Sequence, residues 1–318
     1  ANVLSVLAEN VENMIVGSAD LSNSNKTDGF LKKTKALQEA DFSGAFLQAG
    51  VSELTLAALS VGMSLHGGVI PACGTFFVFS DYMKPVIRVA ALMEQPVIFV
   101  WTHDAFRVGE DGPTHQPVEH EAQIRLLEKL QNHSGHNSML VLRPADVHEA
   151  TVAWKMAFEN GKTPTGLILS RQNINDLPAK ENRYNEALQA EKGAYIVHDD
   201  ADYDVILLAS GSEVSTLVEG AKLLNDNGIK TRIISVPSEG LFRSQSKEYQ
   251  QTVLPHGKKV FGLTAGLPVT LEGLVGTDGA IWGMNSFGFS APYTVLDEKL
   301  GFTGENVFKQ VKKFLNEN

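Results

Sequence analysis

The sequence predicts an α/β protein of two domains, each a mostly parallel sheet flanked by helices. Its length of 318 residues suits about two domains. Short runs that favour strands alternate with helical patterns, as in βαβ units. Residues 173–193 are polar, contain Pro178 and show no strand pattern, so they separate two halves. We place the first domain at residues 1–180, a linker at 181–194 and the second domain at 195–318.

The first half carries the clearest alternation. Strands are expected at residues 14–16, 69–73, 97–101, 139–142 and 167–169. Helices are expected at residues 53–64, 82–93, 118–130 and 146–159. The run Val-Ile-Phe-Val-Trp at 97–101 is strongly β-type because β-branched and aromatic residues fit a pleated sheet.

The second half repeats the pattern. Strands are expected at residues 205–208, 231–236 and 260–263, and helices at 213–224 and 307–315, the last one amphipathic. The turn Ser210-Gly211-Ser212 before Glu213 fits either a capped helix start or an anion site, and we favour the cap. The chain contains neither a P-loop nor a G-x-G-x-x-G at a strand-to-helix turn.

Composition narrows the class of protein. The hydrophobic fraction of 43% is ordinary for a globular protein. The net charge of −10 and the pI of about 5.4 argue against nucleic acid and anionic membranes as partners. Cys73 is the only cysteine and lies in an apolar stretch, which predicts a buried thiol and a reducing, cytoplasmic setting. We expect no membrane span and no signal segment. Because the chain begins at Ala1, we expect its natural start to lie upstream or to have been removed.

The run GEDGPTHQPVE, residues 109–119, is the strongest pointer to function. A loop that follows a strand and carries several titratable groups is suited to a small polar ligand. His103, Asp111 and His115 are the candidate groups in and before this loop. A metal site is the weaker reading, because no helical H-E-x-x-H is present and Gly112-Pro113 would break a helix.

Three other features have both a structural and a functional reading. Glu53 is the lone acid at the start of an apolar helix, placed to interact with the helix dipole or to face a ligand. Phe76, Phe79 and Tyr82 are spaced three apart, which predicts a core stripe or an aromatic pocket. Arg171 ends a strand, so it is a candidate phosphate clamp or a surface ion-pair partner.

These motifs together resemble the pyrimidine-binding part of transketolase, a family of thiamine diphosphate enzymes. The matching segments are Gly50-Val51-Ser52-Glu53, Gly74-Thr75 before the aromatic trio, the 109–119 loop and residues 170–173. Ser52 and Leu54 depart from the commoner family wording around the glutamate. The resemblance runs from about residue 17 to the end of the chain and is weaker in the second domain.

The resemblance implies a role for each candidate residue. Glu53 would hydrogen-bond the aminopyrimidine ring of thiamine diphosphate and so act in catalysis. The other cofactor contacts would be Phe76, Phe79, which we expect to be the main ring contact, Tyr82 and Asp20. His103 and His115 would be catalytic and would also bind the sugar. The remaining substrate contacts would be Asp111, Ser24 and Arg171.

One part of such an enzyme is missing. The Gly-Asp-Gly…Asn segment that holds Mg²⁺ or Ca²⁺ and the diphosphate in this family does not occur, nor does an upstream arginine that contacts substrate phosphate. The chain therefore resembles the C-terminal half of a transketolase, either a natural split subunit or a fragment. We expect a homodimer that is inactive until it meets a diphosphate-binding half.

The activity implied is transfer of a two-carbon ketol group between sugar phosphates, as in the pentose phosphate pathway. Three related activities stay open at this point: dihydroxyacetone synthase, deoxyxylulose-phosphate synthase and the β subunit of a 2-oxo acid dehydrogenase. A non-catalytic dimerising module is a further alternative. The oxo-acid enzymes usually pair the glutamate with a glutamine, whereas Leu54 follows Glu53 here.

Overall fold

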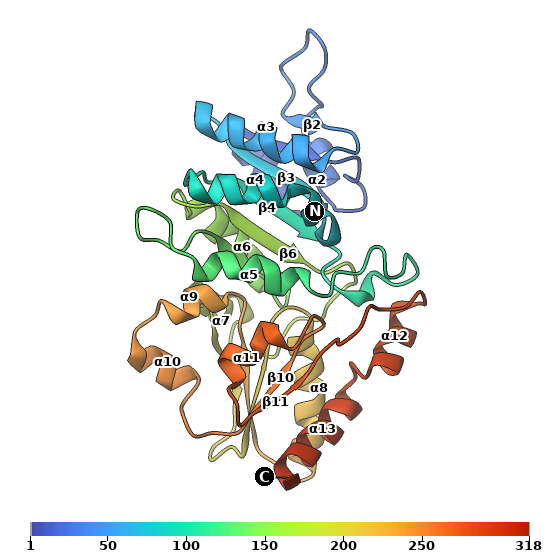
Figure 1. Cartoon of the computed structure of the whole chain (residues 1–318), viewed down its shortest axis with the longest axis vertical. Coiled ribbons are helices and arrows are strands. Elements are labelled where there is room, and N and C mark those ends of the chain that lie inside the picture. Colours follow the sequence, from blue (N-terminus) through green and yellow to red (C-terminus); the bar gives the residue numbers. More distant parts are fainter. Residues whose placement is uncertain (1, 318) are drawn as a thin grey trace.

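A computed structural model describes residues 2–317 and contains two sheets that follow one another along the long axis (Figure 1). The first sheet has six parallel strands in the order β2-β1-β3-β4-β6-β5. Its strands are β1 (Met14–Ser18), β2 (Phe46–Gln48), β3 (Ile70–Phe76), β4 (Ile98–Thr102), β5 (Leu140–Leu142) and β6 (Thr165–Leu169). Every residue of β4 is buried, as its continuous apolar run predicts for a central parallel strand.

Helices cover both faces of this sheet. Figure 1 shows α3 (Glu53–His66), α4 (Ser80–Leu92) and α5 (His120–Lys129) side by side across one face. The other helices of this half are α1 (Asn2–Asn10), α2 (Asp28–Leu31) and α6 (Val147–Glu159). Cys73 lies in the core beneath α3 and α4, so the predicted burial of this thiol is confirmed.

The second sheet has the order β11-β10-β8-β9-β7. Its strands are β7 (Tyr195–Asp199), β8 (Val205–Ala209), β9 (Thr231–Ser235), β10 (Val260–Leu263) and β11 (Ala280–Trp282). All pairs are parallel except β7 with β9. The helices are α8 (Glu213–Asp226), α9 (Glu239–Arg243), α10 (Lys247–Val253), α11 (Val269–Val275), α12 (Tyr293–Leu300) and α13 (Gly304–Glu317). The two-domain α/β fold class is thus confirmed.

The polar stretch between the sheets is more ordered than its sequence indicates. It contains α7 (Arg183–Ala187) and a 3₁₀ turn at Leu188–Lys192. Arg183 donates from Nε to Asp146 at 2.6 Å, and its Nη2 donates to the hydroxyl of Tyr195, also at 2.6 Å. Buried charge pairs hold the segment together with a few core residues, Ala187 and Ala190 among them, and these are too few to give a clear hydrophobic period.

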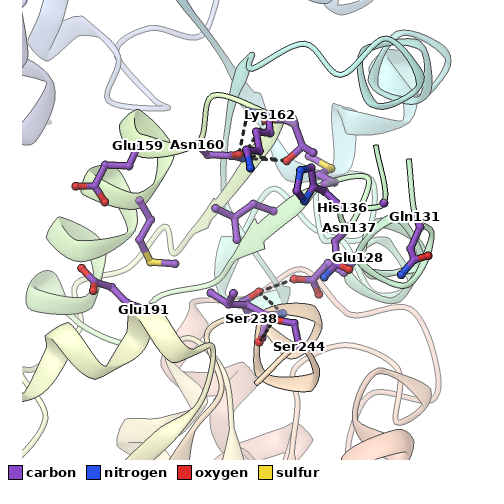
Figure 2. A pocket seen from close by; sticks show the side chains of 16 residues that line it. Glu128, Gln131, His136, Asn137, Glu159, Asn160, Lys162, Glu191, Ser238 and Ser244 are labelled. Atoms are coloured by element: carbon purple, nitrogen blue, oxygen red, sulfur yellow. Dashed lines mark hydrogen bonds between the residues drawn. The ribbon is translucent and has the colours of Figure 1, made fainter. Parts of the chain in front are cut away.

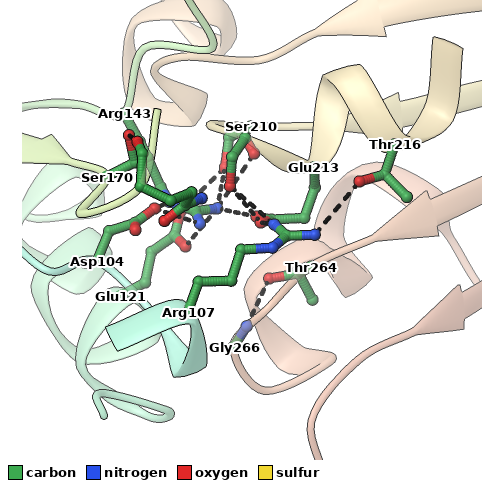
Figure 3. A network of polar contacts seen from close by, with 12 residues as sticks. Asp104, Arg107, Glu121, Arg143, Ser170, Ser210, Glu213, Thr216, Thr264 and Gly266 are labelled. Atoms are coloured by element: carbon green, nitrogen blue, oxygen red, sulfur yellow. Dashed lines mark hydrogen bonds and ion pairs between the residues drawn. The ribbon is translucent and has the colours of Figure 1, made fainter. Parts of the chain in front are cut away.

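Two buried arginines join the domains (Figure 3). Arg143, between β5 and α6, donates to Asp104 at 2.7 Å and forms a short ion pair with Glu213. Arg107 donates to the other oxygen of Glu213 at 3.1 Å and to Asp297 at 2.7 Å. Glu213, fully buried at the start of α8, therefore links one arginine to the other.

This network corrects one prediction. Ser212 occupies the N-cap position of α8, but its side chain makes no capping hydrogen bond. Its hydroxyl accepts from Arg107 at 2.9 Å and donates to Glu213 at 3.0 Å. The acid in the first turn serves ion pairing between domains, which local sequence does not show. Separately, no helix within residues 2–317 combines the length and apolar character that crossing a membrane requires.

Candidate functional site

The candidate residues gather at the carboxyl edge of the first sheet. β1 is followed by β2 on one side and β3 continues the sheet on the other, so the strand order reverses between β1 and β3. Such a switch point is where open parallel sheets bind ligands. Five candidates stand at strand ends here: Asp20 after β1, Glu53 after β2, Phe76 at the end of β3, His103 after β4 and Arg171 after β6.

A cavity of about 530 Å³ opens at this switch point. Glu53 lies on its wall as the first residue of α3, and its side chain is 7% exposed. Thr75 Oγ1 is 3.4 Å from Glu53 Oε1, a weak hydrogen bond that turns the carboxylate toward β3. The rest of the lining consists of Ala19, Asp20, Leu21, Val51, Ser52, Leu54, Thr55, Phe79 and Tyr82.

The aromatic trio forms a continuous series of rings beside the cavity. β3 ends in a 3₁₀ turn (Phe77–Phe79) that leads directly into α4, so residues three apart lie on one side. Phe76 and Phe79 are stacked with centroids 5.9 Å apart and planes 7° apart. Tyr82 follows at 6.1 Å from Phe79 and is 61% exposed. The series thus runs from a buried ring to an exposed one, which is a pocket wall rather than a core stripe.

His103 extends this series of rings beyond Phe76. Its ring stacks on Phe76 at 3.6 Å, and its Nδ1 is 2.9 Å from Thr102 Oγ1. Burial, and next the positive charge of Arg171, lower the pKa of His103 to about 4, although Asp111 opposes this. The imidazole is therefore neutral at neutral pH. Its backbone has φ of 63°, a strained value for a non-glycine residue that is common at functional sites.

The 109–117 loop brings His115 to the same rings. The His115 ring lies 5.4 Å from Phe79 in an edge-on arrangement and 6.3 Å from Phe76. Asp111 is exposed in the same loop and close enough to influence the charge of His103. Glycines 109 and 112 have φ of 89° and 75°, which lets the loop turn back sharply over the site.

The remaining candidates lie at the rim. Arg171 is exposed and near His103, whose pKa its charge lowers. Asp20 is exposed on the lining of the cavity and has a left-handed φ of 60°. Ser24 is exposed in the turn after β1.

Asn25 holds the turn after β1 in place, a role that its sequence context does not predict. Asn25 is 2% exposed, accepts from the backbone N–H of Thr27 at 3.1 Å and from its hydroxyl at 2.7 Å, and donates to Ser18 at 3.1 Å. It fixes the turn between β1 and α2 that carries Asp20 and lines the cavity. The only signal was the triplet Asn-Lys-Thr at 25–27, which also matches a glycosylation sequon.

A second cavity of about 570 Å³ lies between the domains at the amino-terminal edge of the first sheet (Figure 2). None of the predicted site residues lines it. Its most buried acid, Glu128, already accepts from Arg125 at 2.9 Å and from Ser238 at 2.6 Å. Although larger, it lacks the convergence of ligand-binding groups found at the carboxyl edge.

The residues at the carboxyl edge fit a pyrimidine ring. A planar ring with polar nitrogens needs a flat apolar wall and a hydrogen-bonding acid, and the cavity offers Phe79, Tyr82 and Glu53. Within residues 2–317, no three His, Cys, Asp or Glu side chains are grouped to hold an ion.

The fold and the site define an α/β protein with an aromatic-walled cavity at the carboxyl edge of a parallel sheet. Residues 1–176 match the family model described as the transketolase pyrimidine-binding domain, and residues 193–303 match the transketolase-like C-terminal domain. The chain belongs to the transketolase family. The predicted likeness to the C-terminal half of a transketolase is thereby confirmed.

Relatives agree with this placement. Transketolases from Staphylococcus epidermidis and Bacillus subtilis are both 41% identical, over 312 and 318 residues, which is 98% and 99% of this chain. Those stretches are only 45% and 46% of the relatives, so the chain spans less than half their length.

Solved structures show the same relation. The transketolase from Leishmania mexicana superimposes with a TM-score of 0.89 at 36% identity, covering 99% of this chain and 44% of that one. The Pichia stipitis transketolase complex with sedoheptulose-7-phosphate gives 0.88 at 34%, with coverage of 99% and 44%. A solved chain described as "Split gene transketolase, inactive beta4 tetramer" aligns with 99% of this chain, and the alignment covers 96% of that solved chain. At 23% identity and a TM-score of 0.73, that last likeness shows the shared fold.

Proposed function

We propose that this chain supplies the pyrimidine-binding half of a transketolase site, which transfers a two-carbon ketol group from a ketose phosphate to an aldose phosphate in the pentose phosphate pathway. One observation carries the proposal: the Glu53 carboxyl and the Phe79–Tyr82 ring wall line one cavity at the switch point, with neutral His103 stacked beside it. Relatives named transketolase support it, as do Pichia stipitis complexes with sedoheptulose-7-phosphate and fructose-6-phosphate.

The chemistry that bound thiamine diphosphate supplies is a carbon nucleophile for the carbonyl of the donor sugar. Glu53 would hydrogen-bond the aminopyrimidine ring from the start of α3. Phe79 and Tyr82 would form the wall against the ring, with Phe76 supporting them from behind. Asp20 would lie on the cofactor side of the cavity.

The sugar would bind where His103, His115 and Asp111 meet above the aromatic series. The neutral imidazole of His103 can exchange hydrogen bonds with the sugar hydroxyls, and His115 faces the same rings, so we assign both to catalysis. Asp111 would orient hydroxyl groups. Arg171 and Ser24, at the exposed rim, would hold the sugar phosphate.

The diphosphate and its Mg²⁺ or Ca²⁺ would be held by a separate diphosphate-binding half, so the chain alone would be inactive. The exposed apolar side chains of α3 and α4 support an interface with that half or with a second copy in a homodimer. The clearest are Leu54, Leu59, Leu65, Tyr82, Val89, Leu92 and Met93. We place the assembled enzyme in the cytoplasm, and propose the boundaries 1–180, 181–194 and 195–318 for its domains and linker in this chain.

The test is ketol transfer from xylulose 5-phosphate to ribose 5-phosphate with thiamine diphosphate and Mg²⁺. The chain is assayed alone and after mixing with a diphosphate-binding half from the same source. Activity only in the mixture supports the proposal, whereas no activity in a mixture shown to assemble contradicts it. Glu53→Gln should lower turnover at least about 100-fold. Glu272→Gln, an exposed acid on α11, should leave turnover unchanged.

A further inference from the structure

A buried side-chain amide in the 109–117 loop, that of Gln116, contacts the second domain. Gln116 is 2% exposed, and its Nε2 donates to the carbonyl oxygen of Gly109 at 3.1 Å and to that of Phe289 at 2.9 Å. The first bond closes the base of the loop on itself. The second ties that base to the segment before α12.

A second contact lies along the flank of the loop. The exposed hydroxyl of Ser290 donates to the carbonyl oxygen of Glu110 at 2.5 Å. A Cβ on Gly112 would stand 3.2 Å from the Cβ of Ser290. A Cβ on Gly288 would stand 2.0 Å from Gln116 Oε1, so a side chain at 288 would displace the amide. The two segments therefore pack too closely at Gly112 and Gly288 to admit larger side chains there.

We propose that the second domain positions the sugar-recognising loop through Gln116 and Ser290, and that Gln116 is a positioning residue for the reaction. Each anchored residue adjoins a candidate sugar contact: Glu110 precedes Asp111, and His115 precedes Gln116. Fixing the two anchors fixes the backbone from which both side chains project. The inference rests on the proposed function, because it assigns the loop to sugar binding.

The anchors hold orientation rather than the fold as a whole. Of the two anchors, Ser290 is exposed, and so is Asp111 in the loop that it holds. The domains are joined independently through Arg107 and Arg143, so losing the loop anchors leaves that connection intact. Without the two anchors, the loop loses the hydrogen bonds at Glu110 and Gln116, which flank Asp111 and His115.

The decisive variant is Gln116→Glu. It keeps the size of the side chain, but a carboxylate cannot donate to the two carbonyl oxygens. Ser290→Ala removes the flanking anchor at an exposed position, where folding is not at risk. The matched control is Gln245→Glu, which loses one donated bond to the carbonyl oxygen of Leu241, elsewhere in the second domain.

Hydrogen exchange of the isolated chain measures how firmly the loop is held. The amides of Gly112 and His115 are hydrogen-bonded within the loop at 3.1 and 3.0 Å. Loss of two side-chain bonds at its base should speed their exchange about tenfold in Gln116→Glu, and less in Ser290→Ala. The control should exchange there like the wild type. Unchanged loop exchange in both loop variants would overturn the proposal.

Kinetics of the assembled enzyme separate positioning from general damage. In Gln116→Glu, kcat/KM for the donor sugar should fall about tenfold, while affinity for thiamine diphosphate stays unchanged because the aromatic wall is untouched. A looser loop with normal kinetics would overturn the positioning role. If the wild-type assembly shows no ketol transfer, the proposed function fails and the sugar role fails with it. The exchange data would still decide whether the second domain holds the loop.

Discussion

Removing the charge of Arg143 should destabilise the protein more than any surface change of the same kind. Arg143 is 1% exposed and meets three carboxylates, those of Asp104, Glu121 and Glu213. Burial alone would lower its pKa, but these carboxylates raise the pKa of Arg143 well above its usual value, so it is always charged. Arg143→Met keeps most of the volume and removes the cation.

The loss of stability depends on which ion-pair partners the three carboxylates keep in the variant. Glu213 retains Arg107 at 3.1 Å, and Glu121 retains Arg125 at 2.9 Å. Asp104 is 6% exposed and loses its ion-pair partner. Leaving one buried charge uncompensated costs about 3–5 kcal/mol. For domains of this size that lowers Tm by roughly 6–20 °C.

Urea unfolding followed by tryptophan fluorescence, together with calorimetry, measures this loss. The control is Arg88→Met. Arg88 is exposed on α4, and its loss should cost about 0.5 kcal/mol or less. If the two variants lose the same stability, the buried network does not join the domains as described.

Three further outcomes can be measured. Burial raises the pKa of Cys73 to about 12, so the native chain should not react with a thiol reagent at pH 8 until it is unfolded, and a fast reaction would contradict the buried position. Burial and Arg171 hold the pKa of His103 near 4, against 6.5 for a free histidine, so Arg171→Gln should raise it in an NMR titration. Because the unfolded chain takes up this proton first, stability should fall as pH drops from about 6.5 to about 4, and a flat profile would count against the neutral ring. Gly193→Ala should cost about 2–4 kcal/mol in urea unfolding, since Gly193 has φ of 84° and a Cβ there would lie 2.3 Å from a backbone nitrogen of α9. Gly228→Ala, with φ of 78° and open space around it, should cost only about 1 kcal/mol, and equal losses would refute the clash.

The fold class could be predicted because its signals are local. The strand expected at 97–101 is observed at Ile98–Thr102, and that expected at 260–263 coincides with β10. Once the strands are parallel, the clustering of Glu53, Phe76 and His103 follows, because the carboxyl ends of parallel strands share one edge. Several elements were not predicted, among them the three-residue strands β2 and β11 and the five-residue β7. The equally short β5 was predicted because its apolar run extends over residues 139–142.

The contacts between the domains could not be predicted. Arg107 meets Asp297 across 190 positions, and Arg143 meets Glu213 across 70. A charged residue in a sequence is usually exposed, so nothing local indicates that these are buried. The same holds for Gln116, whose partner Phe289 is 173 positions away. Long-range polar pairing leaves no periodic trace.

The ordered stretch between the two sheets, which contains α7, restricts movement between the domains. Arg183 donates to Asp146, and Tyr195 donates to Glu149 at 2.7 Å, so both ends of this stretch are bonded to α6 or to the residue before it. Arg107 and Arg143 fasten the domains at a second place. Rotating one domain against the other would break the buried Tyr195–Glu149 hydrogen bond at the first place and buried ion pairs at the second. We therefore expect the body of the chain to act as a rigid frame, so that a ligand would enter and leave through movement of surface loops.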